Sequence, residues 1–334
     1  MTTTEATLFE AFLNQHDSDA WTDTINKLIP KIHLVDKNAT KIWFAFFPLD
    51  LAKALQSSLD SVELARKLQL KGSFYLKDQI DSSHTFFYGH RYWPEVKSAI
   101  AEQALSNKAP TSLELSAQIS DIASNVAKKF SIDTSLVIGI TAVAFMTLQQ
   151  VGITAFKISP GKVLIDAKTK KSPEEVLANR AKDNNQGLIM QFLRTIDRVW
   201  TVTFNENDPQ ATFKLINGQD IATAGANDKG DHKSRDPRCV EGPVPVECRS
   251  AACGTCWVGI LGGAEKLAPV SQQEKKRIRE FGYINTDETH PIIRLACVTP
   301  ANGAISIVVP PWNGVFGRQL RQLKETDSQI EPSY

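Results

Sequence analysis

Three of the chain's five cysteines fall within nine residues, in the stretch VECRSAACGTCWV from 246 to 258. They are Cys248, Cys253 and Cys256, and the spacers between them are small apart from Arg249. Small residues let a backbone bend sharply and approach a bound group, and Gly254 can adopt a positive φ. The pattern constrains the fold strongly, because the chain must form a tight loop here that gathers three thiols.

A fourth thiol follows at Cys297, in the segment RLACVTP. Four cysteines at this spacing can hold a 2Fe–2S cluster. A four-cysteine zinc site is the main alternative, but zinc prefers paired C-x-x-C units and only Cys253 and Cys256 form one. A disulfide framework suits a reducing compartment poorly. A Rieske centre needs two histidine ligands, and the nearest, His232 and His290, lie outside the motif.

Residues from about 198 to 312 resemble a 2Fe–2S ferredoxin of the plant-type, β-grasp family. The stretch PVPVECRSAACGTCWVGIL is similar to the family's cluster loop, and IIRLACVTP is similar to the segment that carries its fourth ligand. The resemblance implies a ferredoxin domain at 196–318 and a 2Fe–2S cofactor, with no catalytic side chain. It also implies the ligands, which serve both as cofactor-binding and as metal-binding residues: Cys248, Cys253, Cys256 and Cys297.

The pattern around the cysteines predicts the elements of such a domain. The segments 198–206 and 211–218 are rich in β-branched and aromatic residues and predict a hairpin. Strands are also expected at 257–261 and 304–310, and a capping box at Ser271 predicts a short helix after it. The segment from 222 to 242 is longer than the short helix that ferredoxins usually place there, so we expect an exposed insertion.

Cys239 is the one cysteine outside this set. Its position, nine residues before Cys248, leaves two interpretations open. The first is a free, partly buried thiol that behaves as a small hydrophobic residue. The second is a redox-active or alternative ligand.

The first part of the chain, residues 1–156, has apolar residues mostly at helical spacing and resembles no family that we recognise. The chain is therefore expected to be α+β, a mainly helical domain followed by the β-grasp domain. Residues 157–195 predict a charged linker with a short helix, and 319–334 a polar tail. Helices are expected at 5–15, 20–29, 49–57, 61–69, 94–106, 112–130 and 134–150.

Two aromatic segments stand out in this half. SSHTFFYGHRYWPEVK, residues 82–97, includes His84, His90 and Trp93 and can line a ligand pocket or a docking face. The alternative is a loop whose aromatic rings pin helices together. KIWFAFFPLD, residues 41–50, predicts a buried strand or short helix.

Composition limits the location and the partners. The net charge of +1 favours neither nucleic acid nor a membrane surface. The apolar run at 135–156 has an uninterrupted part too short to span a bilayer, which predicts a buried helix and makes membrane association unlikely. The N-terminus has no secretory pattern, so a cytoplasmic location is expected.

Three functions fit these patterns, the third being a structural or assembly protein in which the cluster only holds the fold together. The first is a one-electron carrier whose helical half docks a specific redox partner; the sequence identifies neither donor nor acceptor. The second is an electron-transfer subunit of a multicomponent oxidoreductase, with a substrate or partner pocket in the N-terminal half. A flavin or nicotinamide fingerprint is not found, so turnover by this chain alone is not expected.

Overall fold

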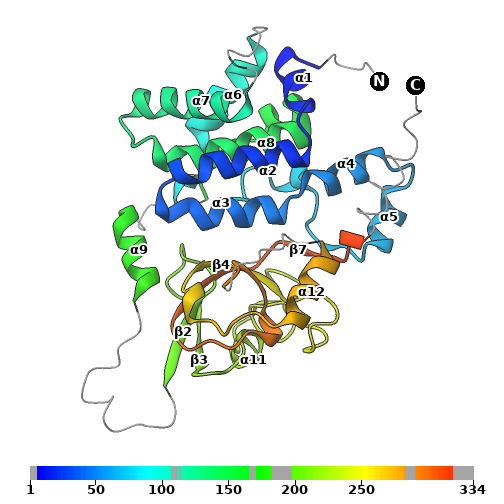
Figure 1. Ribbon diagram of the computed structural model, residues 1–334, viewed down its shortest axis with the longest axis vertical. Helices are drawn as coiled ribbons and strands as arrows, with labels where there is room; N and C mark the ends of the chain where they lie inside the picture. The colour runs from blue at the N-terminus through cyan, green and yellow to red at the C-terminus, as the bar shows by residue number, and fades with distance from the viewer. Residues whose placement is uncertain are drawn as a thin grey trace. The chain divides into compact units, whose positions relative to one another are not determined.

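The computed structural model describes residues 6–106, 112, 114–164, 171–182, 198–282 and 290–318. The chain forms two compact units (Figure 1). Unit 1 comprises Met1–Lys53 and Tyr75–Pro173, and unit 2 comprises Ala54–Phe74 and Glu174–Tyr334. Helices and a small mixed sheet are both present, which agrees with the expected α+β class.

Unit 1 is helical in its described residues and is built around one apolar helix. The central helix, α8, contacts α1, α2, α3, α6 and α7, as well as the three 3₁₀ turns that precede α6. The elements are α1 (Leu8–Asn14), α2 (Ser18–Leu28), η1 (Ile29–Lys31), α3 (Leu34–Phe46), η2 (Leu76–Gln79), η3 (Tyr88–Tyr92), α6 (Trp93–Leu105), α7 (Leu115–Phe130) and α8 (Ser135–Ile158), while α4 (Leu49–Ser57) crosses the boundary between the units.

Within the described residues, α8 is the one helix long and apolar enough to cross a membrane. Of its most apolar window, 78% is buried inside the protein. The helix is interrupted at Gly152, which has φ 76°. The N–H of Ile153 donates to the Glu10 carboxylate at 2.7 Å, so α1 satisfies the backbone group at this break.

The aromatic segment 41–50 forms the second half of α3 and the start of α4, so the helical alternative is correct. Helix α3 crosses α8 closely at Gly139, where a Cβ would lie 2.7 Å from Thr40 Oγ1. Trp43 and Phe46 are completely buried. The segment is therefore core, as expected.

Unit 2 contains a five-stranded sheet of order β3-β2-β6-β4-β5. Strand β2 runs parallel to β6, and the other neighbours are antiparallel. Helix α12 packs on β5, and α11 packs on β3. The elements are α5 (Ser61–Lys67), β1 (Lys71–Gly72), α9 (Pro173–Ala181), β2 (Val199–Thr203), β3 (Thr212–Ile216), α11 (Ile221–Gly225), β4 (Trp257–Gly262), η4 (Ala264–Lys266), α12 (Gln272–Phe281), β5 (Ile293–Leu295), η5 (Ala296–Val298), β6 (Ile305–Val308) and β7 (Trp312–Asn313).

The unit boundary differs from the expected one, which placed all of residues 1–156 in one domain. Residues 54–74 group with unit 2, because β1 pairs with β7 through Gly72 and Trp312. The backbone contact continues beyond this pair, because the Ser73 N–H donates to the Pro311 carbonyl at 2.9 Å. An early segment of the chain thus completes the C-terminal unit.

The expected linker helix is present as α9, and it belongs to unit 2. Arg180 forms a largely buried ion pair with Glu206 at 2.8 Å, which ties α9 to the chain just after β2. The rest of the predicted linker, at 165–170 and 183–197, lies outside the described residues, as does the predicted tail 319–334. The expected insertion is present after the short helix α11, and most of residues 226–241 are exposed.

Candidate metal centre

The sheet brings the two cysteine segments together. Strands β4 and β5 pair antiparallel, with Trp257 opposite Leu295. Cys256 directly precedes this pair on one strand and Cys297 follows it on the other, so both lie at the same end of the ladder. The Ala296 N–H donates to the Cys256 carbonyl at 2.9 Å. The last cysteine of the loop is therefore fixed beside the distant Cys297.

The loop from Cys248 to Cys256 curls by means of left-handed backbone. Arg249, Ala251 and Gly254 have φ of 52°, 58° and 70°. Such conformations cost energy for residues with a Cβ, and two of these three have one. Strain of this kind persists only where the surrounding structure holds it in place, and it is common at ligand sites.

The curled loop directs backbone N–H groups at sulfur. Ala252 and Cys253 donate to Cys248 Sγ at 3.2 and 3.3 Å. Ala251 donates to Cys297 Sγ at 3.4 Å, which links the loop to the distant segment. Donors around sulfur stabilise the thiolate form, which is the form that binds metals. The small spacer residues noted in the sequence make this approach possible.

The four thiols interact in two pairs. Cys248 interacts directly with Cys253, and Cys256 with Cys297. The sulfur of Cys248 also acts electrostatically on Cys297, and that of Cys253 on Cys256. The two pairs therefore lie close together.

The thiol pKa values reflect this crowding. The Cys297 contact, with burial, raises the pKa of the Cys256 thiol well above its usual range, and the same contact lowers the pKa of Cys297. Burial works to raise the pKa of the Cys248 thiol, but hydrogen bonds from the loop backbone and from Cys253 lower it to about 7. Cys248 is thus prepared to ionise near neutral pH.

In the part of the chain that the structure describes, no three His, Cys, Asp or Glu side chains are arranged around a single point as one metal ion requires. A two-iron cluster takes its protein ligands differently, two on each iron. The observed arrangement of two adjacent thiol pairs fits that donor set.

A buried ion pair supports the Cys297 segment. Arg294 on β5 donates to both carboxylate oxygens of Glu274 on α12 at 2.9 and 3.0 Å, and both side chains are 1% exposed. The same carboxylate accepts from the Leu295 N–H and the Thr299 hydroxyl at 3.0 and 3.3 Å. The sequence analysis did not identify this pair. The sequence feature that could have revealed it is Arg294, a charged residue in an otherwise apolar strand, three positions before Cys297.

Cys239 has a separate environment. Its thiol is 5% exposed and donates to the Pro243 carbonyl at 3.4 Å. Burial, with a contribution from Asp236, raises its pKa to about 11. These features match the first interpretation, a buried thiol outside the cluster-binding set.

The aromatic segment of unit 1 packs inward. His84, His90 and Trp93 are fully buried. Leu164 N–H donates to His90 Nε2 at 2.9 Å, so the His90 proton lies on Nδ1 and is donated to His84 Nδ1 at 2.8 Å. His84 Nε2 then donates to the Ile80 carbonyl at 3.1 Å. Burial lowers the pKa of His84 well below its usual range and that of His90 to about 4. Both rings are therefore neutral core residues.

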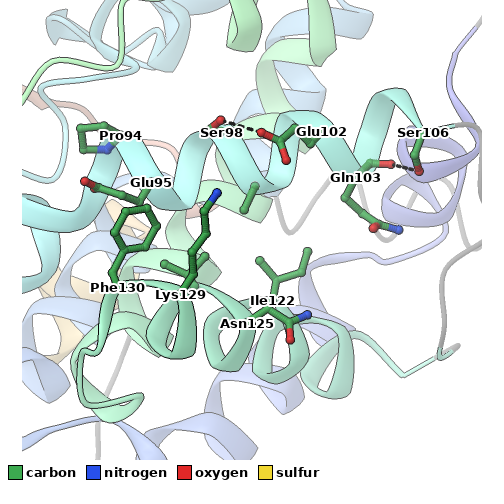
Figure 2. Close-up of a pocket in the computed structure, with 12 residues that line it drawn as sticks. Pro94, Glu95, Ser98, Glu102, Gln103, Ser106, Ile122, Asn125, Lys129 and Phe130 are labelled. Carbon is green, nitrogen blue, oxygen red and sulfur yellow. Dashed lines mark hydrogen bonds between the residues drawn. The ribbon is translucent and has the colours of Figure 1, made fainter.

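A cavity of about 590 Å³ does occur in unit 1, one helix further on (Figure 2). It lies between α6 and α7 and includes Glu95, Glu102 and Lys129 in its lining, with the Phe130 ring near Glu95. Ser98 donates to Glu102 at 3.0 Å along the same helix. Pro94 and Glu95, at the end of the aromatic segment, line this cavity, whereas His84, His90 and Trp93 pack in the core, as expected for rings that hold helices together.

Comparison of the chain with protein-family models, with curated proteins and with solved structures finds no match.

Proposed function

We propose that the protein is a one-electron carrier that binds a 2Fe–2S cluster through Cys248, Cys253, Cys256 and Cys297. The observation that carries the proposal is the arrangement of these thiols as two adjacent pairs within reach of loop N–H donors. When bound, such a cluster accepts and releases one electron at a time. The chain itself needs no acid, base or nucleophile for this.

The sheet of unit 2 supports the finer assignment to the β-grasp ferredoxin class. Its first hairpin, β2 and β3, is followed by the short helix α11, and β6 returns parallel to β2 in the middle of the sheet. This strand order also positions the two cysteine segments, because β4 and β5 are paired neighbours and both segments leave the sheet at the same end of that pair. The sheet and the cysteine pattern are independent of each other, and both favour the same class.

The protein's own groups would set how easily the cluster is reduced. The N–H donors on the Cys248 and Cys297 sulfurs stabilise negative charge, which favours the reduced state. Cys256 and Cys297 are buried, whereas Cys248 and Cys253 are half-buried beside the exposed residues Ser250 and Ala252. Electrons would therefore enter and leave on the Cys248 and Cys253 side.

The helical unit 1 has a separate part in the proposal, the docking of a specific redox partner. A second candidate function is an electron-transfer subunit of a multicomponent oxidoreductase, and the cavity between α6 and α7 is the observation that favours it. The two differ in outcome, because only the subunit would copurify with an enzyme whose turnover depends on it. Either function fits the cytoplasm, the location that we propose.

The test is iron and acid-labile sulfide analysis of freshly purified protein, with paramagnetic resonance after reduction by dithionite. We expect two irons and two sulfides per chain, visible absorption that bleaches on reduction, and a resonance signal from the reduced state. Colourless protein with stoichiometric zinc would contradict the proposal.

A matched pair of variants tests the ligand set. Cys297→Ser removes one member of a thiol pair and is expected to abolish the normal spectrum. Cys239→Ser changes a thiol with its own partner and should leave the spectrum and the iron content unchanged. Loss of iron in Cys239→Ser, or its retention in Cys297→Ser with an unaltered spectrum, would show that the ligands are assigned wrongly.

A further inference from the structure

Helix α12 has an unbalanced outer face. It carries four cationic residues, Lys275, Lys276, Arg277 and Arg279, against two carboxylates. One carboxylate, Glu274, is turned inward and neutralised by Arg294. The other, Glu280, pairs with Arg277 at 2.7 Å on the surface. The face that solvent meets is therefore positive, although the whole chain has a net charge of only +1.

This positive face lies next to the candidate metal centre. Phe281, the last residue of α12, is 2% exposed and packs against the loop. A Cβ at Gly254 would lie 3.0 Å from its ring. Gly254 stands between Cys253 and Cys256, so the helix is in contact with the segment that supplies three of the four proposed ligands.

The charges at the loop itself are balanced by neighbours. Arg249, inside the loop, pairs with Glu241 of the insertion. Glu247, just before the loop, pairs with Lys71 at 2.6 Å. Neither pair adds net charge where the loop is exposed. Helix α12 therefore adds an excess of positive charge beside the loop.

We propose that the outer face of α12, in unit 2, is a second docking surface beside the one proposed for unit 1, and that it binds a redox partner protein whose own docking face is acidic. The inference rests on the proposed electron-carrier function and names its kind of partner. Complementary charge speeds the encounter and orients the two proteins, and the contact of α12 with the loop would leave such a partner close to the cluster. An anionic lipid surface is the competing occupant that the test must exclude.

The test measures binding of a fluorescein-labelled decaglutamate peptide to the full-length protein by fluorescence anisotropy at about 0.1 M ionic strength. Lys275→Glu with Lys276→Glu is expected to weaken binding about tenfold or more. Lys275→Gln with Lys276→Gln should give a smaller loss and confirms that the effect is one of charge. Thermal melting and circular dichroism verify that each variant is folded.

A matched control carries the same charge change elsewhere in the unit. Arg198→Glu with Lys214→Glu alters two exposed cations. Arg198 directly precedes β2 and Lys214 lies on β3, at the sheet edge opposite β5 and α12. We expect binding within about twofold of the unmodified protein. Four strand spacings of about 4.8 Å separate β3 from β5, roughly 19 Å, which exceeds the screening length of about 10 Å at 0.1 M salt. Equal losses in both double variants, or no loss in either, would overturn the proposal. So would tighter binding to vesicles of equal parts phosphatidylserine and phosphatidylcholine than to the peptide.

A second measurement links the surface to electron transfer. Protein is reduced with dithionite and then freed of it; the reduced cluster gives one electron to ferricyanide, so that the cluster is oxidised and ferrocyanide forms. Saturating peptide is expected to slow this reaction severalfold, because peptide and ferricyanide compete for the same positive face. Unchanged rates with bound peptide would overturn the proposal. The anisotropy measurement needs no cluster, so absence of iron would refute the carrier function separately.

Discussion

Gly254 is the residue with the least room in the cysteine loop. It combines φ 70° with an approach of 3.0 Å between its missing Cβ and the Phe281 ring. Any larger residue there must bear both a left-handed backbone and a contact with a buried aromatic side chain.

We predict that Gly254→Ala destabilises the protein by about 1–3 kcal/mol and lowers its iron content. Adding Phe281→Leu should recover part of the loss, because a smaller side chain removes the contact and leaves only the backbone cost. Chemical denaturation of both variants measures the difference. No recovery would mean that the Phe281 contact is unimportant.

The buried pair of Glu274 and Arg294 gives a second prediction at this scale. Glu274→Gln leaves the Arg294 guanidinium charged and uncompensated, so a loss of about 3–5 kcal/mol in the free energy of unfolding is expected. Glu280→Gln, on the same helix, breaks a surface pair and should cost at most about 1 kcal/mol. Similar losses in the two variants would show that burial of the pair is not what matters.

At the scale of elements, periodicity and capping predicted most of what the structure contains. The alternating residues of 198–216 form β2 and β3, and the capping box at Ser271 begins α12. Strand β1 escaped prediction for a physical reason. It has two residues and owes its conformation to β7, which is remote in sequence, so no local pattern records it. The four cysteines could be grouped from the sequence because metal chemistry restricts the spacing of such ligands. The partners that hold their segments are tertiary and left no such pattern.

We predict that Gly72→Ala disrupts the pairing of β1 with β7. Gly72 has φ 89°, and a Cβ there would lie 2.4 Å from the Pro311 carbonyl oxygen, so the strands must separate. Hydrogen exchange at the Ser73 amide should accelerate by at least about tenfold. Lys71→Ala in the same strand removes a surface ion pair alone and should leave that exchange rate almost unchanged.

The buried histidines predict that the protein loses folding stability in acid. The pKa of His90 is about 4 in the folded protein and near 6.5 when it is exposed, so the unfolded state binds more protons between these values. Stability is therefore fully present above pH 6.5 and falls as the pH drops towards 4, by about 3 kcal/mol from His90. Urea denaturation across this range measures it. The slope should flatten in His90→Gln and persist in the control His16→Gln.

At the scale of the whole molecule, the two units are not a simple fusion. The chain passes between them after Lys53, after Phe74 and after Pro173. The sequence suggested a single boundary, because its pattern shows where helices give way to strands. The pattern does not show which segments pack together in the folded protein.

We predict that a fragment of residues 174–334 folds poorly alone. It lacks α5 and β1, and therefore the backbone partners of β7. Joining residues 54–74 to this fragment through a flexible linker should restore a cooperative thermal transition and iron binding. A stable, iron-containing fragment without residues 54–74 would contradict the prediction.

The pairing of Gly72 with Trp312 also orders events during synthesis. Ribosomes add about 5–20 residues per second, so roughly 10–50 s separate the emergence of the two partners. During that interval the nascent α5 and β1 have no sheet to join, and Cys297 is still untranslated when the first three thiols appear. The proposed cluster could then assemble only after Cys297 has emerged, and the early segment is where a chaperone would be needed meanwhile.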